Sequence, residues 1–185
     1  MRLFLSTSAV LWFLTLVGCG PVIDPDGAWA DLGQGAGAFL AFDDGAVFEV
    51  ERGAQGGMHI WVSLQTYGID PGPTEMWQGL VDGSLPIIQF QLASAEGVLT
   101  EDLERPYVLE RLGDSEYQLL DNLVQFDHFP ELPEDWQSLD WDQVERDLEE
   151  QALQLSVQIV DAQGTVVEER RSIKIDFPEE VMFGR

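Results

Sequence analysis

The chain has 185 residues, and its 34 acidic and 9 basic side chains give a formal net charge of −25. Such a surface repels phosphate backbones and anionic headgroups, which excludes nucleic-acid binding and membrane attachment through a basic patch. The length suits one domain with a substantial core. The sequence has one cysteine, Cys19, so no disulfide can form within the chain and packing alone must stabilise that core.

The chain begins with the pattern of an export signal. A basic residue precedes an apolar run over residues 3–18, which is shorter than the roughly 20 residues of a membrane-spanning helix. The run ends in Leu16-Val17-Gly18-Cys19, an order that resembles the lipobox of bacterial lipoproteins. The resemblance implies removal of a signal peptide, residues 1–18, and acylation of Cys19.

This resemblance also implies a location. We expect a bacterial cell-envelope protein whose partner is the lipid bilayer, held through acylated Cys19. Gly20 after the cysteine implies sorting to the outer membrane. The alternative is a plain signal peptide cut elsewhere, which would leave Cys19 as a free thiol.

A glycine-rich segment follows the lipobox. Residues 20–37 hold five glycines and two prolines without apolar periodicity. Such a composition is typical of a flexible linker. The sequence therefore predicts a tether over residues 19–37 and a single domain over residues 38–185.

The rest of the chain has the two-residue period of β-strands. Asp43-Asp44-Gly45 predicts a hairpin between two short apolar runs. Met58 to Thr66 alternates clearly, and so does the segment that begins with Leu153. Further strands are expected at residues 87–92, 107–112, 117–126 and 165–177.

These strands predict an all-β fold. Seven or eight short strands with frequent turns favour an antiparallel sandwich. The last two strands resemble the closing hairpin of immunoglobulin-like modules, which implies an immunoglobulin-like β-sandwich. A lipocalin-like barrel is the alternative. Glu168 to Arg171 is polar on both faces, as expected of an exposed or edge segment.

An acidic segment, residues 131–150, interrupts the β pattern. Trp141, Val144 and Leu148 have helical spacing, and Ser138 is a candidate N-cap. We expect one short acidic helix near residues 139–150 that crosses between strands. Its carboxylates form either a solvated face or a loose cation site.

Catalytic constellations are missing from the sequence. It has no G-x-S-x-G motif, two histidines and one cysteine, which is predicted to carry lipid. The glycines of the tether do not lie between a strand and a helix, as a nucleotide site requires. We expect no catalytic residues, no cofactor and no enzymatic activity.

Two binding surfaces remain as candidates. His59, Trp61 and Tyr67 lie on one face of a predicted strand and form a candidate ligand face for a glycan, a peptide or an envelope protein. Alternatively, the acidic helix covers this face. His59, Asp127 and His128 are weak candidate ligands for zinc or copper, since imidazole and carboxylate groups suit these ions.

The segment Gln55 to Trp61 resembles a strand entry in uncharacterised secreted lipoproteins, which implies no activity. We therefore expect a non-enzymatic binding or structural module in the envelope. The alternatives are a divalent-cation-binding protein, with calcium or with zinc or copper, and a carbohydrate- or peptide-binding module that uses the His59 and Trp61 face.

Overall fold

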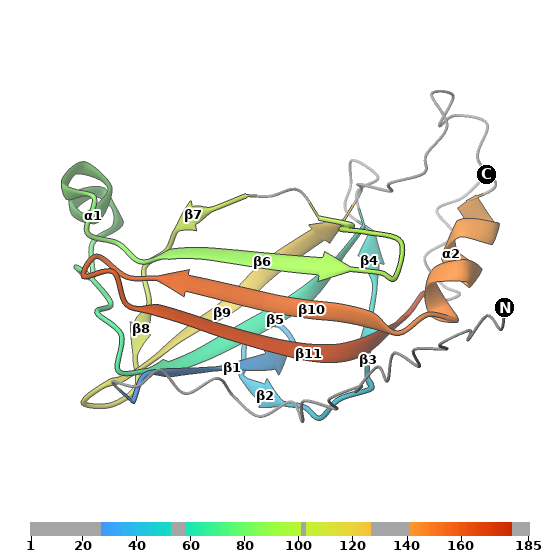
Figure 1. Cartoon of the computed structure of the whole chain (residues 1–185), viewed down its shortest axis with the longest axis horizontal. Coiled ribbons are helices and arrows are strands. Elements are labelled where there is room, and N and C mark those ends of the chain that lie inside the picture. Colours follow the sequence, from blue (N-terminus) through green and yellow to red (C-terminus); the bar gives the residue numbers. More distant parts are fainter. Residues whose placement is uncertain (1–26, 53–57, 101–102, 127–140, 179–185) are drawn as a thin grey trace, which may run out of the picture.

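The computed structural model describes residues 27–52, 58–100, 103–126 and 141–178. Their strands form two sheets that pack face to face as a sandwich (Figure 1). The first sheet has the order β2-β1-β5-β9-β8, with β4 also paired to β5. The second sheet has the order β3-β11-β10-β6-β7. The prediction of a mostly β sandwich is confirmed, and a single closed barrel is not what these strands form.

The strands have the following bounds. The first sheet contains β1 (Trp29–Gln34), β2 (Leu40–Ala41), β4 (Glu51–Arg52), β5 (Met58–Tyr67), β8 (Glu110–Arg111) and β9 (Glu116–Phe126). The second sheet contains β3 (Ala46–Glu49), β6 (Ile87–Ala93), β7 (Arg105–Pro106), β10 (Leu153–Val160) and β11 (Val166–Asp176). Four of these strands have two residues, so the described strands outnumber the seven or eight predicted.

The core lies between the sheets and is built by alternation. Leu155 and Ile159 of β10 point inward, opposite Ile60 and Leu64 of β5, and all four are fully buried. Burial of each such side chain contributes about 1.5–3 kcal/mol. The period-two pattern therefore placed these two strands correctly.

The predicted tether over residues 19–37 is too long. β1 occupies Trp29–Gln34, and Ala30 and Leu32 of this strand are buried in the core. Gly33 in this strand serves packing, because a Cβ there would collide with the side chains of Ser63 and Phe39. The first strand of the sandwich thus lies within the segment predicted to be flexible.

The predicted hairpin at Asp43-Asp44-Gly45 is also wrong. β2 pairs with β1, whereas β3 pairs in parallel with β11, so this turn carries the chain from one sheet to the other. The turn is fixed to β11 at Ser172, whose backbone N–H donates to Asp44 Oδ1 (2.7 Å) and whose carbonyl accepts from Gly45 N–H (2.7 Å).

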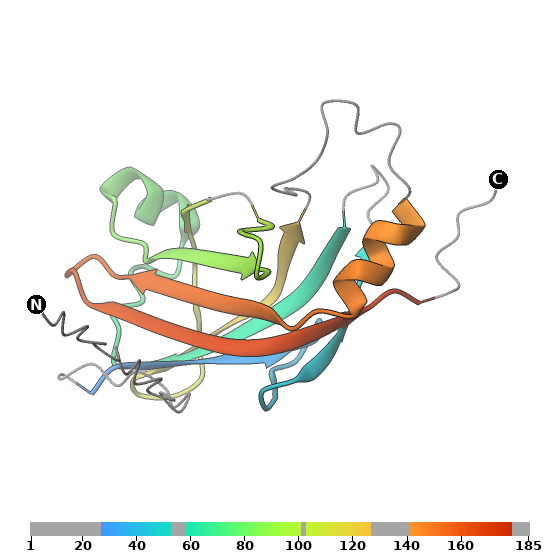
Figure 2. The same ribbon diagram turned by 45° about the vertical axis from the view of Figure 1, so that its right-hand side comes forward.

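The acidic helix is present as α2 (Trp141–Glu149), between β9 and β10. Leu148 is buried in the core, and Glu149 accepts a hydrogen bond from the backbone N–H of Phe177 just after β11 (3.0 Å). Glu145 forms an ion pair with Arg52. The helix therefore closes one end of the sandwich and does not lie across a sheet face (Figure 2).

A second helix, α1 (Met76–Asp82), lies at the opposite end of the sandwich, between β5 and β6. No pattern in the sequence predicted this helix. Among the described residues, no helix is long and apolar enough to cross a membrane.

The polar half of β11 is an edge, as predicted, because β3 pairs only with its second half. Its inward side chains are nevertheless buried. Glu169 is 3% exposed and pairs with Arg171 (3.1 Å), which also binds Asp31 of β1 (3.0 Å). Through these ion pairs Arg171 links β11 of the second sheet to β1 of the first.

Candidate functional site

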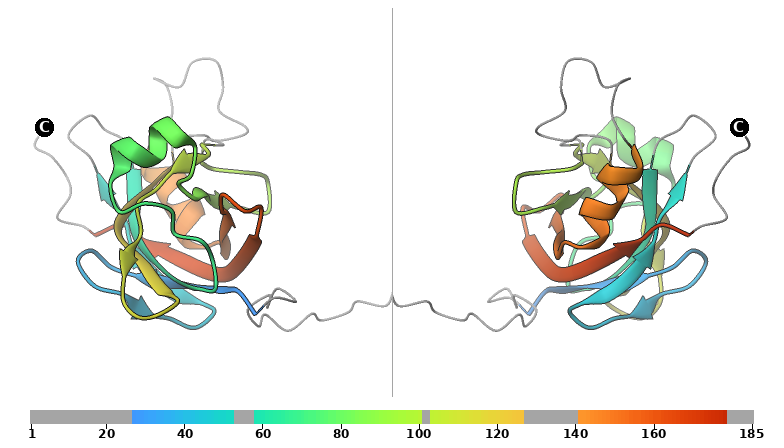
Figure 3. Two further views of the ribbon diagram at one scale, coloured as in Figure 1. Left: turned by 90° about the vertical axis from the view of Figure 1, so that its left-hand side faces the viewer. Right: turned by 90° about the vertical axis from the view of Figure 1, so that its right-hand side faces the viewer.

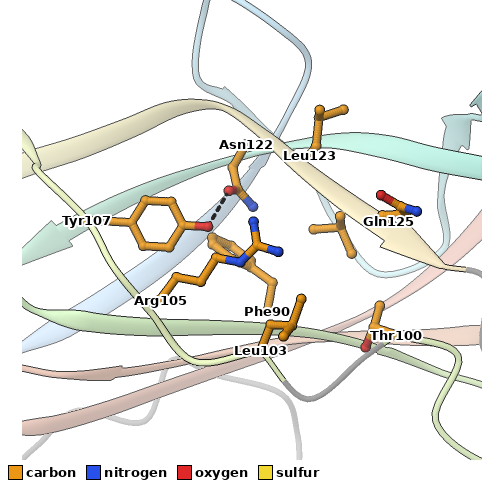
Figure 4. Close-up of a pocket in the computed structure, with 9 residues that line it drawn as sticks. Phe90, Thr100, Leu103, Arg105, Tyr107, Asn122, Leu123 and Gln125 are labelled. Atoms are coloured by element: carbon orange, nitrogen blue, oxygen red, sulfur yellow. Dashed lines mark hydrogen bonds between the residues drawn. The ribbon is translucent and has the colours of Figure 1, made fainter. Parts of the chain in front are cut away.

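A pocket of about 230 Å³ lies between the sheets, on the side where β6 and β7 face β9 (Figure 4). Its volume is somewhat below the range of about 300–1,000 Å³ for drug-sized ligands, so it suits a small molecule. The lining residues are Phe90, Thr100, Leu103, Arg105, Tyr107, Asn122, Leu123, Val124 and Gln125.

A β-bulge in β9 shapes this pocket. The pairing of β9 with β5 shifts between Val62 and Leu64, which pair with Asn122 and Leu119, so two residues of β9 oppose Ser63 alone. Asp121 within the bulge has a φ of 54°, in the left-handed region. Its side chain accepts a hydrogen bond from the backbone N–H of Gly37, which holds the bulge in place.

The bulge changes which side chains of β9 point inward. Tyr117 and Leu119 face the core before it, and Val124 and Phe126 face the core after it. The extra residue therefore turns Asn122 into the pocket. Bulges often re-aim a side chain beside a functional site in this way.

Asn122 accepts a hydrogen bond from the hydroxyl of Tyr107 (2.8 Å). Burial raises the pKa of Tyr107 above its ordinary value, although the positive charge of Arg105 opposes the rise. Tyr107 therefore stays neutral at physiological pH, and its hydroxyl donates the hydrogen bond to Asn122 Oδ1. The amide N–H₂ of Asn122 remains available to a ligand.

Arg105 supplies the positive charge of the pocket. Its guanidinium extends toward Asn122, beside the Tyr107 hydroxyl (Figure 4). No described residue forms an ion pair with Arg105. Arg105 is exposed, so its guanidinium is accessible to a ligand that enters the pocket.

The polar groups left free in the pocket are mainly hydrogen-bond donors. Arg105 and the Asn122 amide both donate, and Arg105 has the fork geometry that matches a carboxylate. Phe90, Leu103 and Val124 provide apolar walls. The described lining has no carboxylate, imidazole or thiol for acid–base or nucleophilic chemistry.

The predicted ligand face is only partly assembled. The rings of His59 and Trp61 lie 5.7 Å apart in an edge-on arrangement, and His59 also lies 3.5 Å from Glu51. Tyr67 belongs to a different cluster, because it stacks on Trp29 at the far end of β5 (6.1 Å). Trp61 itself is half-buried.

The candidate metal ligands are not brought together by the described residues. Asp127 and His128 lie outside those residues, as does the predicted lipidation site Cys19, and His59 lies beside Glu51. The described ranges contain no group of three or more histidine, cysteine, aspartate or glutamate side chains arranged to hold a metal ion.

The pocket residues were not among the sequence predictions. A signal for them exists in β9, where the buried alternation moves from odd to even positions across Leu120-Asp121. Such a phase change indicates a bulge. No pattern in the sequence around Arg105 predicts its place in the pocket, because that place depends on the pairing of β7 with β6.

Comparisons of the chain with protein-family models, with curated protein sequences and with solved structures give no match.

Proposed function

We propose that this chain is a lipid-anchored lipoprotein of the bacterial envelope and a non-enzymatic binding module. In this proposal Cys19 carries the acyl chains, Gly20 directs sorting to the outer membrane, and the pocket between the sheets takes a small organic anion. The observation that carries the binding role is the convergence of Arg105, Tyr107 and Asn122 in that pocket.

We further infer an immunoglobulin-like sandwich. In immunoglobulin domains the strands A, B, E and D share one sheet in that order, and C, F and G share the other. The order β1-β5-β9-β8 and the order β6-β10-β11 correspond to these two sets, with chain order preserved. This correspondence supports an immunoglobulin-like topology beyond the closing hairpin noted in the sequence.

The anchor has a direct test. Cys19→Ala removes the only thiol that can accept lipid. We expect cells that express this variant to incorporate no labelled palmitate into the protein, whereas the unsubstituted chain is labelled. Equal labelling of both would refute the anchor.

The proposed ligand class follows from the donors. A carboxylate would meet the Arg105 fork and the Asn122 amide, and its apolar body would contact Phe90, Leu103 and Val124. Long-range repulsion by the acidic surface is weak at this point, because physiological salt screens charges beyond about 8 Å.

The pocket is tested with short aliphatic and aromatic carboxylates and their neutral amides, by calorimetry on the full chain. We expect the acids to bind and the amides to bind more weakly. Arg105→Gln should weaken acid binding about tenfold to a hundredfold, since a hydrogen bond to a charged group contributes about 1.5–3 kcal/mol.

Arg111→Gln is the matched control, because Arg111 is an exposed arginine outside the pocket that already pairs with Asp114. Its affinity for the acids should equal that of the unsubstituted chain. Acids that bind neither protein, or that bind the Arg105→Gln variant equally well, would contradict the proposed site.

A further inference from the structure

Helix α1 exposes a contiguous apolar face to solvent. In the sequence Met76–Asp82 the two pairs Met76 and Leu80, and Trp77 and Val81, are four residues apart and adjacent to one another. Their exposed fractions are 53% for Met76, 78% for Trp77, 45% for Leu80 and 70% for Val81. Such a cluster of large apolar side chains marks an interaction surface.

The opposite side of α1 fixes this orientation. Gly79 is buried, and a Cβ there would collide with the side chain of Leu85, so the helix packs on the domain through its glycine. At about 100° per residue, Trp77 and Val81 lie opposite Gly79 and point away from the domain. In Figure 3, α1 projects at one end of the sandwich.

The loop before α1 is tied to the neighbouring turn between β10 and β11. Asp161 accepts hydrogen bonds from the backbone N–H groups of Asp70 (2.8 Å), Thr165 (2.8 Å) and Gln163 (2.9 Å). Although burial opposes ionisation, these bonds lower the pKa of Asp161 below its ordinary value. The charged form of Asp161 thus holds the loop, and with it the apolar face, in place.

The amino-terminal end of the domain emerges at the same end of the sandwich. Trp29 pairs with Tyr67, the last residue of β5 before the α1 loop, and a Cβ on Gly68 would lie 3.1 Å from Ala28. In Figure 1 the start of β1 and α1 lie at the same end. A chain of nine residues joins Cys19 to Ala28 and can span at most about 32 Å.

We infer that the apolar face of α1 rests in the interfacial region of the bilayer that holds the acylated Cys19. This inference rests on the proposed anchor. Trp77 has the side chain that favours the membrane interface, and the stacked Trp29 and Tyr67 lie at the same end of the domain. Because Glu75 and Asp82 flank the face and no base does, neutral zwitterionic headgroups are the surface it fits.

The test uses the acylated chain in phosphatidylcholine vesicles with a fluorophore on an introduced cysteine. Acylation blocks Cys19, so Val81→Cys or Val47→Cys supplies the only free thiol. Val47 is a matched control, since it is an exposed valine on β3, in the half of the molecule near α2. We expect the label at Val81 to lie about 5–10 Å into the interface and to resist iodide quenching several-fold better than the label at Val47.

A second variant tests the apolar face itself. Trp77→Ser with Leu80→Ser, both exposed, should make the label at Val81 as accessible to iodide as the label at Val47. Anionic lipid in the vesicles should reduce the protection of the label at Val81.

Equal quenching at Val81 and Val47 in the acylated chain would overturn the inference. Protection that grows with the number of chains per vesicle would also overturn it, in favour of a second copy. A free thiol in the unsubstituted chain would instead refute the anchor.

Discussion

Arg171→Met should lower the free energy of unfolding by about 3–5 kcal/mol, because it leaves the buried Glu169 without its positive partner. Methionine keeps most of the apolar part of the arginine side chain, so the loss of stability measures the effect of removing the charge. Urea unfolding of the full chain measures it as a lower midpoint at an unchanged slope. Arg111→Met is the control, and this exposed pair should matter by less than about 1 kcal/mol.

The same variant should respond to pH. Burial raises the pKa of Glu169 above its ordinary value of 4.5, although Arg171 opposes the rise, while Asp31 and Asp44 add to it. A carboxyl with a raised pKa destabilises the fold only as pH rises above its unfolded value. Removal of Arg171 enlarges that cost.

The free energy of unfolding that Arg171→Met loses relative to the unsubstituted chain should therefore be larger at pH 7 than at pH 4. Adding Glu169→Leu to Arg171→Met should recover most of the stability, since apolar side chains can replace a buried ion pair. A deficit that is the same at both pH values, or that Glu169→Leu deepens, would contradict this explanation.

Gly72→Ala should destabilise the fold by about 2–5 kcal/mol. Gly72 has a φ of 66°, a conformation that costs an L-residue about 1–2 kcal/mol. A Cβ there would also collide with the carbonyl oxygen of Ser84, and relief of such overpacking costs about 1–3 kcal/mol more.

Gly83→Ala separates these two causes. Gly83 has a φ of 64° at the end of α1, and a Cβ there would meet nothing within 4 Å. This variant should lose only about 1–2 kcal/mol, the backbone cost alone. Thermal unfolding of both variants gives the comparison, and equal losses would show that the loop before α1 absorbs the collision.

The sequence predicted the parts of the fold that alternation alone determines. β5 and β10 have apolar side chains at every second position, and burial on one face leaves them a single register. The acidic helix was found because Val144 and Leu148 have helical spacing. The strand β1 was missed because its glycine content is typical of a linker. In the structure, Gly33 of this strand packs closely against Phe39.

Arg105 and Asn122 of the candidate site depend on the pairing of distant strands, which no local pattern predicts. The same holds for two further features of the fold. No local pattern shows that Asp43-Asp44-Gly45 joins two sheets, because the partner of β3 is β11, the last strand that the structure describes. The short helix α1 packs through one glycine and turns its apolar residues outward, the reverse of the amphipathic pattern that identifies a surface helix. In both cases tertiary contacts override the local signal.

The parallel pairing of β3 with β11 has a consequence for the time at which the domain folds. Ala46 and Ile173 are neighbours in this ladder but lie far apart in the sequence, so the ladder forms only when β11 is available. Pairings between such distant residues are slow to form. If the chain is exported through its proposed signal peptide, this delay would leave it unfolded until β11 has also been exported.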